Sequence, residues 1–166
     1  MKKTILVLAM LFSIAIFGQT KVKVVGVLDG DTYYCQNLKK TETFVVRLAN
    51  VDCPEVANKH TGKSAQPFGL DVKITIKGLL LNQIIAIKVI KTDKYFRKIA
   101  MVKMPNGKDL ATYLIKNGYA WCYFDYQKDR TDEPKFLRYQ QKAQLNKLGL
   151  FAEENPTPPW IYRKKQ

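Results

Sequence analysis

Short apolar runs separated by turn-forming residues fill the first two-thirds of the chain and predict β-strands. The runs are rich in valine and isoleucine, which suit a pleated surface, and Asp29-Gly30-Asp31 is a turn signal between the first two. We expect five strands, at residues 21–28, 32–36, 42–49, 84–90 and 98–104.

Three further segments predict helices. Residues 68–81 are ambiguous, because residues 72–76 alternate as in a strand, but the longer stretch has apolar residues at helical spacing and favours a helix. Asp109 can cap a second helix, which Gly118 would end. A third helix is predicted from residue 132 or 134 to residue 148, before a glycine.

This order of elements favours a mainly β, or α+β, fold. A small closed or partly open β-barrel with about three packed helices accommodates five strands in a chain of 166 residues. An α+β sheet with helices on one face is the alternative. Residues 53–67 are rich in polar residues, proline and glycine, and predict a long surface loop of the kind that often carries function.

The N-terminus has the pattern of a secretory signal peptide. Two lysines precede a run of 13 residues, 5–17, that is apolar except for Ser13, and small and polar residues follow at 18–20. A membrane span needs about 20 residues, so we expect cleavage near residues 18–20 rather than a retained anchor. We therefore expect a secreted or periplasmic protein, without stable membrane association after cleavage.

The expected organisation is a signal peptide at residues 1–19, one folded domain at 20–154, and an extended proline-rich, basic tail at 155–166. Three cysteines, Cys35, Cys53 and Cys122, leave at least one without an intramolecular partner. Apolar neighbours favour buried free thiols, although export also allows a bridge between Cys35 and Cys122.

Charge and composition narrow the chemistry. Twenty-eight Lys and Arg against 14 Asp and Glu give a net charge of +14, which favours a polyanionic partner: nucleic acid, anionic membrane or acidic glycan. The single histidine excludes a two-histidine ribonuclease mechanism and, with three scattered cysteines, a standard zinc site. Neither serine lies in a G-x-S-x-G motif, which argues against a serine hydrolase.

Four carboxylates, those of Asp29, Asp31, Asp52 and Glu55, fall within 27 residues of this basic chain. Two lie at the first hairpin turn and two follow the third strand, so neighbouring strands can bring them together. Asp31 and Asp52 would then offer hard oxygen ligands suited to Ca²⁺ or Mg²⁺. Ordinary turn chemistry also explains Asp-Gly-Asp by itself.

Two arginines accompany these carboxylates. Arg47 precedes Asp52 by five residues and would form either a structural ion pair or a clamp for a phosphate group. Arg97 lies beside Tyr95 in a polar segment that, taken alone, is typical of a solvated hairpin.

Three motifs in this order and spacing resemble the staphylococcal nuclease family: residues 27–32 (VLDGDT), 46–55 (VRLANVDCPE) and 93–97 (DKYFR). Weaker similarities lie at residues 66–69, 118–121, 149–151 and 158–160, so the resemblance covers roughly residues 22–163. It implies a five-stranded OB-fold barrel with three helices. It also implies a calcium-dependent, sugar-nonspecific nuclease that cleaves DNA and RNA to 3′-phosphate products, and we expect a monomer.

The resemblance also implies roles for particular residues. The metal ligands would be Asp31, Asp52 and the backbone carbonyl of Cys53. The catalytic residues would be Arg47, Glu55 and Arg97. The substrate-binding residues would be Tyr95, Tyr126 and Lys94, although solvated charge is the simpler interpretation of the lysine. Phosphodiester hydrolysis suits this set, because the calcium ion would polarise the phosphate, the glutamate would orient or activate water, and the arginines would stabilise the transition state.

Two positions depart from the family pattern. Phe96 stands where the family usually has glycine, so either the turn differs or the ring lies outward, and the placement of Arg97 depends on which. Phe124 stands where an ungapped alignment expects a substrate-contacting tyrosine, and Tyr123 would replace it only with a shift of one residue. The alternative functions are a catalytically silent nucleic-acid-binding module and a structural or glycan-binding barrel.

Overall fold

The computed structural model describes residues 18–58, 62, 64–126 and 131–165. Five strands close into a barrel in the order β1-β2-β3-β6-β5, in which β3 and β6 are parallel and the other pairs are antiparallel. The strands are β1 (Thr20–Val27), β2 (Thr32–Asn37), β3 (Thr43–Leu48), β5 (Ile84–Thr92) and β6 (Lys98–Lys103). The predicted five-stranded barrel is therefore confirmed, and the single open sheet is excluded.

Alternating side chains fill the barrel. Successive residues of a strand face opposite sides, and the inward-facing ones are mostly β-branched: Val22, Val24, Cys35, Val46, Ile85, Ile87, Ala100 and Val102 are all buried. The register shifts after Val24 in β1 and after Val89 in β5, and such bulges let strands curve enough to close a small barrel.

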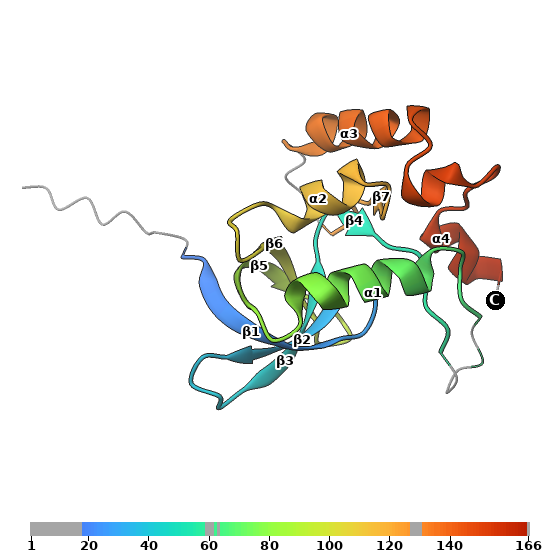
Figure 1. Ribbon diagram of the computed structural model, residues 1–166. Helices are drawn as coiled ribbons and strands as arrows, with labels where there is room; N and C mark the ends of the chain where they lie inside the picture. The colour runs from blue at the N-terminus through green and yellow to red at the C-terminus, as the bar shows by residue number, and fades with distance from the viewer. Residues whose placement is uncertain (1–17, 59–61, 63, 127–130, 166) are drawn as a thin grey trace, which may run out of the picture.

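Two helices lie against barrel strands, and a third stacks on the second of these helices, as can be followed in Figure 1. The described residues contain α1 (Gly69–Leu80), α2 (Leu110–Lys116), α3 (Glu133–Leu145) and the short α4 (Pro159–Tyr162). α1 buries residues at helical spacing against the barrel core, as the helical interpretation of residues 68–81 predicts. Asp109 caps α2 by accepting a hydrogen bond of 2.7 Å from the Thr112 N–H. α3 packs against α2.

A second, two-stranded sheet lies beside the barrel. β4 (Val51–Asp52) pairs antiparallel with β7 (Trp121–Cys122), and the Tyr123 N–H extends the contact by donating to the Asn50 carbonyl. The pattern of apolar residues did not predict these strands, because each has only two residues. This small sheet fixes Asp52 at the end of β3.

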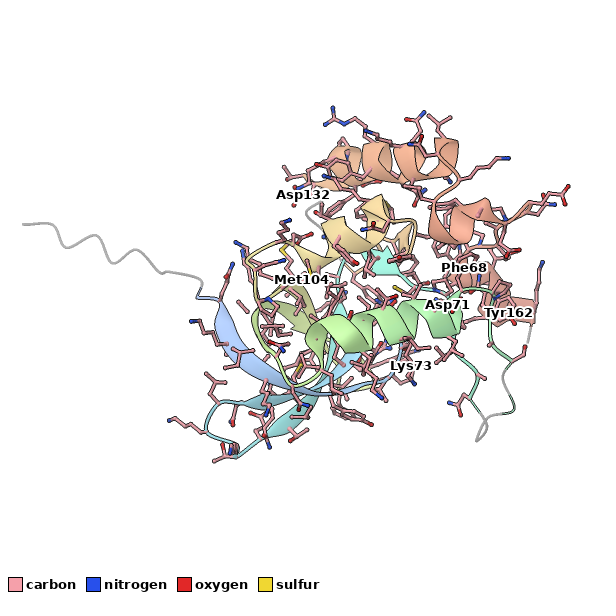
Figure 2. All side chains as sticks on the ribbon, in the orientation of Figure 1. Phe68, Asp71, Lys73, Met104, Asp132 and Tyr162 are labelled. Carbon is pink, nitrogen blue, oxygen red and sulfur yellow. The ribbon has the colours of Figure 1, made fainter. Side chains whose placement is uncertain are left out.

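The C-terminal segment differs from the extended tail that its prolines indicate. It contains the 3-10 helices η1 (Gly149–Ala152) and η2 (Arg163–Lys165), with α4 between them. Pro159 begins α4, where its missing N–H costs no hydrogen bond. Trp160 packs edge-on against Trp121, with ring centroids 6.1 Å apart. The Tyr162 hydroxyl donates to the Ala65 carbonyl at 2.8 Å, and Figure 2 shows Tyr162 at the end of the molecule where α1 begins.

The end of α3 and the state of the cysteines can be compared with the predictions from the sequence. α3 ends at Leu145 rather than near residue 148, because Lys147 adopts a left-handed φ of 49° and stops the helix. All three cysteines are buried free thiols, which excludes the bridge between Cys35 and Cys122 in this structure.

Within the described ranges, no helix is long and apolar enough to cross a membrane. The apolar run at residues 5–17 lies outside them.

We predict that Gly118→Ala lowers the free energy of unfolding by about 3 kcal/mol or more. Gly118 follows α2 with a φ of +66°, and an added Cβ would lie 2.0 Å from the Leu148 carbonyl oxygen. The matched control is Gly78→Ala in α1, where an added Cβ meets nothing within 4 Å. Helix propensity should make this control more stable by about 1 kcal/mol. Urea unfolding measures both, and equal stability of the two variants would contradict the packing argument.

Candidate active site

A cleft of about 280 Å³ lies where the turn before β2, the loop after β4, the turn between β5 and β6, and the C-terminal segment meet. It is lined by Asp29, Asp31, Thr32, Arg47, Asp52, Cys53, Pro54, Glu55, Tyr95, Arg97, Tyr126 and Arg163. The structure thus brings together eight of the nine predicted site residues. Lys94 does not line the cleft, and its ammonium lies 5.1 Å from the centre of the Tyr95 ring.

Asp31 is held in place by the turn that joins β1 to β2. Its backbone N–H donates to Asp29 Oδ1 at 2.9 Å, and its Oδ1 accepts from the Thr32 hydroxyl at 3.0 Å. Its Oδ2 accepts from the Cys53 N–H at 2.7 Å. A Cβ at Gly30 would lie 2.8 Å from the Cys53 Cβ, so only glycine lets the turn approach this loop so closely. The glycine therefore brings Asp31 to the residues that follow β4.

Arg47 links the two aspartates at the floor of the cleft. Only 4% of this residue is exposed, and its Nε lies 3.1 Å from Asp31 Oδ1 while its Nη2 lies 2.7 Å from Asp52 Oδ1. Its Nη1 donates to the carbonyls of Leu48 at 2.8 Å and Val51 at 3.0 Å. Three of the five guanidinium N–H groups therefore donate hydrogen bonds within the protein, Nε forms an ion pair with Asp31, and the structural ion pair that the sequence left open is present.

Burial disfavours the ionised form of both aspartates. It raises the pKa of Asp31 from 3.8 to about 7, although the charge of Arg47 opposes the shift. Burial likewise raises the pKa of Asp52, and Arg47 again opposes the shift. The charge of the neighbouring Asp29 raises the pKa of Asp31 further. Burial therefore disfavours the ionised form of both carboxylates, and the charge of Arg47 offsets part of that cost.

Glu55 is positioned by the loop that leaves β4. The buried Gln66 fixes the backbone of this loop, because its side-chain oxygen accepts from the Glu55 N–H at 3.2 Å and its own N–H donates to the Glu55 carbonyl at 2.9 Å. A Cβ at Gly69 would lie 2.1 Å from that same carbonyl oxygen, so the start of α1 packs directly on the loop. Glu55 is thereby held at the edge of the cleft, on the side of Asp52.

Arg163 reaches these carboxylates from the C-terminal segment. Its Nη1 lies 2.5 Å from Glu55 Oε1 and 3.2 Å from Asp52 Oδ1, and its Nη2 lies 2.9 Å from Asp52 Oδ2. The sequence indicated only a basic tail residue, which is most simply solvated charge. No local signal identified it, because it is separated from Asp52 by 111 positions along the chain.

The turn between β5 and β6 presents Arg97 and Tyr95. Asp93 organises the turn, because its Oδ1 accepts from the backbone N–H of Tyr95 at 2.9 Å and of Arg97 at 3.0 Å. Its Oδ2 accepts from Arg97 Nε at 2.8 Å. Burial opposes the effect, but these hydrogen bonds from Arg97 and Tyr95 lower the pKa of Asp93 overall. The Arg97 guanidinium lies 5.5 Å from the centre of the Tyr95 ring.

Phe96 adopts the left-handed backbone conformation that favours glycine. Its φ is 61°, its N–H donates to the Asp93 carbonyl, and its side chain is 86% exposed. The outward orientation that the sequence left open is therefore the one observed. Arg97 lines the cleft in spite of the substitution.

The aromatic residues after β7 separate into two groups. Tyr126 lines the cleft, with its ring centre 5.7 Å from the guanidinium of Arg47 and 5.7 Å from the ammonium of Lys91. Phe124 is buried and stacks on Phe136 with ring centroids 6.3 Å apart, so it lies outside the cleft. Tyr126 is therefore the aromatic from this segment that a ligand in the cleft would meet.

Comparisons with known proteins agree with this geometry. The family model described as staphylococcal nuclease homologue matches residues 45–153. The chain is 30% identical over 144 residues to a protein of Escherichia coli O157:H7 named "Uncharacterized endonuclease", with 87% of this chain and 85% of that protein covered. A Haemophilus influenzae protein of the same name is 31% identical over 144 residues, covering 87% of this chain and 73% of its own. A Shigella flexneri protein named "Micrococcal nuclease" is 28% identical over 163 residues, with 93% and 87% covered.

Together with the barrel and its cleft, these matches define the chain as a nuclease, an enzyme whose substrates are nucleic acids. It belongs to the staphylococcal nuclease family.

We predict that Asp31 makes the stability of the metal-free protein fall as the pH rises. The folded protein holds the Asp31 proton up to about pH 7, whereas the unfolded chain loses it near pH 3.8. This stabilising contribution is therefore complete below the lower value and is lost as the pH rises through the higher one. In Asp31→Asn, the free energy of unfolding in urea with a chelator should fall less steeply between about pH 4 and 7. Asp71→Asn on the exposed face of α1 is the control, and identical slopes in the two variants would contradict the prediction.

Proposed function

We propose that the chain is a calcium-dependent, sugar-nonspecific nuclease that hydrolyses phosphodiester bonds of DNA and RNA and leaves 3′-phosphate ends. The observation that carries the proposal is the convergence of Asp31, Asp52, Glu55, Arg47 and Arg97 on one cleft from four separate segments. Nucleic-acid binding alone requires basic and aromatic groups but no set of carboxylates, which hydrolysis does use.

The proposed role of each residue follows from the position of its side chain and from the hydrogen-bonding groups that the protein leaves unused. Glu55 orients a water molecule and accepts its proton, since it lies at the edge of the cleft on a backbone fixed by Gln66. Arg97 stabilises the developing charge on the phosphate oxygens, because Asp93 occupies only its Nε–Nη2 edge. Arg47 contributes one remaining N–H and positions Asp31 and Asp52.

The oxygen donors of the cleft fit a calcium ion. Asp31, Asp52 and the Cys53 carbonyl would hold it, and calcium also accepts water and substrate oxygens, so two carboxylates suffice. Over the described part of the chain, no group of three or more His, Cys, Asp or Glu side chains is placed to hold a metal. A bound calcium ion would polarise a phosphate oxygen and provide a position for the attacking water.

The charge balance of the cleft supports the need for a cation. Its lining contains four carboxylates against three guanidinium groups, although the chain as a whole has a net charge of +14. With all four carboxylates ionised, a phosphate group meets a centre that is not positive unless a divalent cation is added. The basic surface outside the cleft would attract the polyanion as a whole.

Two further proposals concern the mature protein. The basic start and the apolar run at residues 5–17 support export with cleavage near residues 18–20, so the enzyme would be secreted or periplasmic. We also propose that it acts as a monomer, since the carboxylates and arginines that the proposed mechanism uses all come together within a single chain.

The deciding experiment incubates the protein, beginning at Gln19, with single-stranded DNA and with RNA, in Ca²⁺ or in chelator. We expect both substrates to be cleaved in Ca²⁺ only. The products should block primer extension until a phosphatase removes the 3′-phosphate. Binding without cleavage would support the catalytically silent module instead, and cleavage in chelator would contradict the calcium requirement.

Glu55→Gln should retain the fold but lose activity by at least about 10²-fold, because the amide cannot accept a proton from water. The matched control is Glu154→Gln, an exposed position outside the cleft, which should keep wild-type turnover. Initial rates on an oligonucleotide measure the effect, and circular dichroism verifies the fold. A variant with near-wild-type turnover would remove Glu55 from the mechanism.

A further inference from the structure

Arg163 enters the cleft from a segment beyond the part of the chain that the family model matches, residues 45–153. The backbone of this segment is anchored without the Arg163 side chain. Pro159 is buried, and Trp160 packs against Trp121 and Tyr123 with ring centroids 6.1 and 5.4 Å apart. The Tyr162 hydroxyl donates to the Ala65 carbonyl. Packing and this hydrogen bond therefore hold the segment beside the cleft in addition to the ion pairs of Arg163.

The hydrogen bonds of Arg163 use one edge of the guanidinium. The Nη1–Nη2 edge faces Asp52, at 3.2 and 2.9 Å, and the second Nη1 hydrogen is directed to Glu55 at 2.5 Å. Within the described residues, no acceptor bonds to Nε or to the second hydrogen of Nη2. Those two N–H groups lie on the same edge and form a planar fork, and the side chain is 34% exposed.

A fork of this kind matches a phosphate group, whose oxygens accept two parallel hydrogen bonds. Arg47 has no such edge left, because three of its N–H groups donate hydrogen bonds within the protein and its Nε pairs with Asp31. Arg97 keeps one edge, on the side of the cleft formed by the turn between β5 and β6. Arg163 therefore offers a second complete fork to the cleft, from the C-terminal side.

We propose that Arg163 is a further substrate-binding residue, which holds a phosphate group of the nucleic acid through its Nε–Nη2 edge while its other edge holds Asp52 and Glu55. The proposal rests on the proposed nuclease site, since it concerns a phosphate of the same substrate. The same guanidinium reduces the repulsion between these carboxylates and the phosphate. The C-terminal segment is thereby part of the substrate site.

Binding without turnover tests the proposal directly. A fluorescein-labelled single-stranded oligonucleotide of twelve thymidines is titrated in chelator and followed by anisotropy, and a gel verifies that it stays intact. Arg163→Ala should raise Kd by about 10-fold or more. The slope of log Kd against log salt should fall by about 0.7, the value for one lost phosphate contact on a single strand.

Two variants separate the fork from bulk charge and from folding. Arg138→Ala, at an exposed position of α3 outside the cleft, removes the same charge and should leave Kd within about twofold of wild type. Arg163→Lys keeps the charge and removes the planar fork, so its Kd should stay several-fold above the wild-type value. It also provides a folded variant in case Arg163→Ala unfolds. The proposal would be overturned if Arg163→Ala had the same Kd as Arg138→Ala, or if Arg163→Lys had the same Kd as the wild type.

Turnover distinguishes this proposal from the proposed function. In Ca²⁺, Arg163→Ala should raise KM by about as much as it raises Kd, whereas a purely structural role would lower kcat and leave the binding slope unchanged. If the wild-type protein cleaves neither DNA nor RNA, the proposed function fails, and the binding measurements still decide the role of Arg163.

Discussion

The buried guanidinium of Arg47 is the interaction on which the rest of the site depends. It lies between Asp31, in the turn before β2, and Asp52, in the short strand β4, so it joins two segments that are distant in sequence. Isolated buried charges are costly, and a buried ion pair is tolerated only when hydrogen bonds satisfy its remaining donors and acceptors. Here the carbonyls of Leu48 and Val51 accept the other Arg47 donors, which sets the path of the chain from β3 into β4.

That arrangement explains why the C-terminal segment matters to a site on the barrel. Arg47 contacts only one oxygen of Asp52, and the second oxygen accepts from Arg163. The packing of Trp160 and the hydrogen bond of Tyr162 therefore contribute to the charge balance of the cleft, although neither side chain lines it. The turn before β2, strand β4 and the loop after it supply the acids, whereas a segment after the last long helix supplies part of the compensating charge.

Sequence patterns predicted the parts of the molecule that local physics determines. The five barrel strands follow from runs of β-branched residues, and α2 follows from a capping aspartate and a terminal glycine. The juxtaposition of Asp31 and Asp52 followed from turn and strand-end positions. The two-residue strands, the helix at Pro159 and the role of Arg163 arise from contacts across the fold, which no local period records. A basic residue in a proline-rich segment has the same sequence signature whether it is solvated or held by two carboxylates.

The three arginines of the cleft show how far residue type alone determines a role. All three have the same five donors. Among the residues that the structure describes, Arg47 donates three hydrogen bonds and pairs with Asp31 through Nε, whereas Arg97 and Arg163 each keep one complete edge. Burial and these contacts make Arg47 mainly a link between segments with one N–H left for a ligand, whereas the partly exposed Arg97 and Arg163 each keep a complete edge. Because a guanidinium is planar, one edge can hold the protein's own carboxylate while the other remains available. A single arginine side chain can therefore stabilise the protein with one edge and bind a ligand with the other.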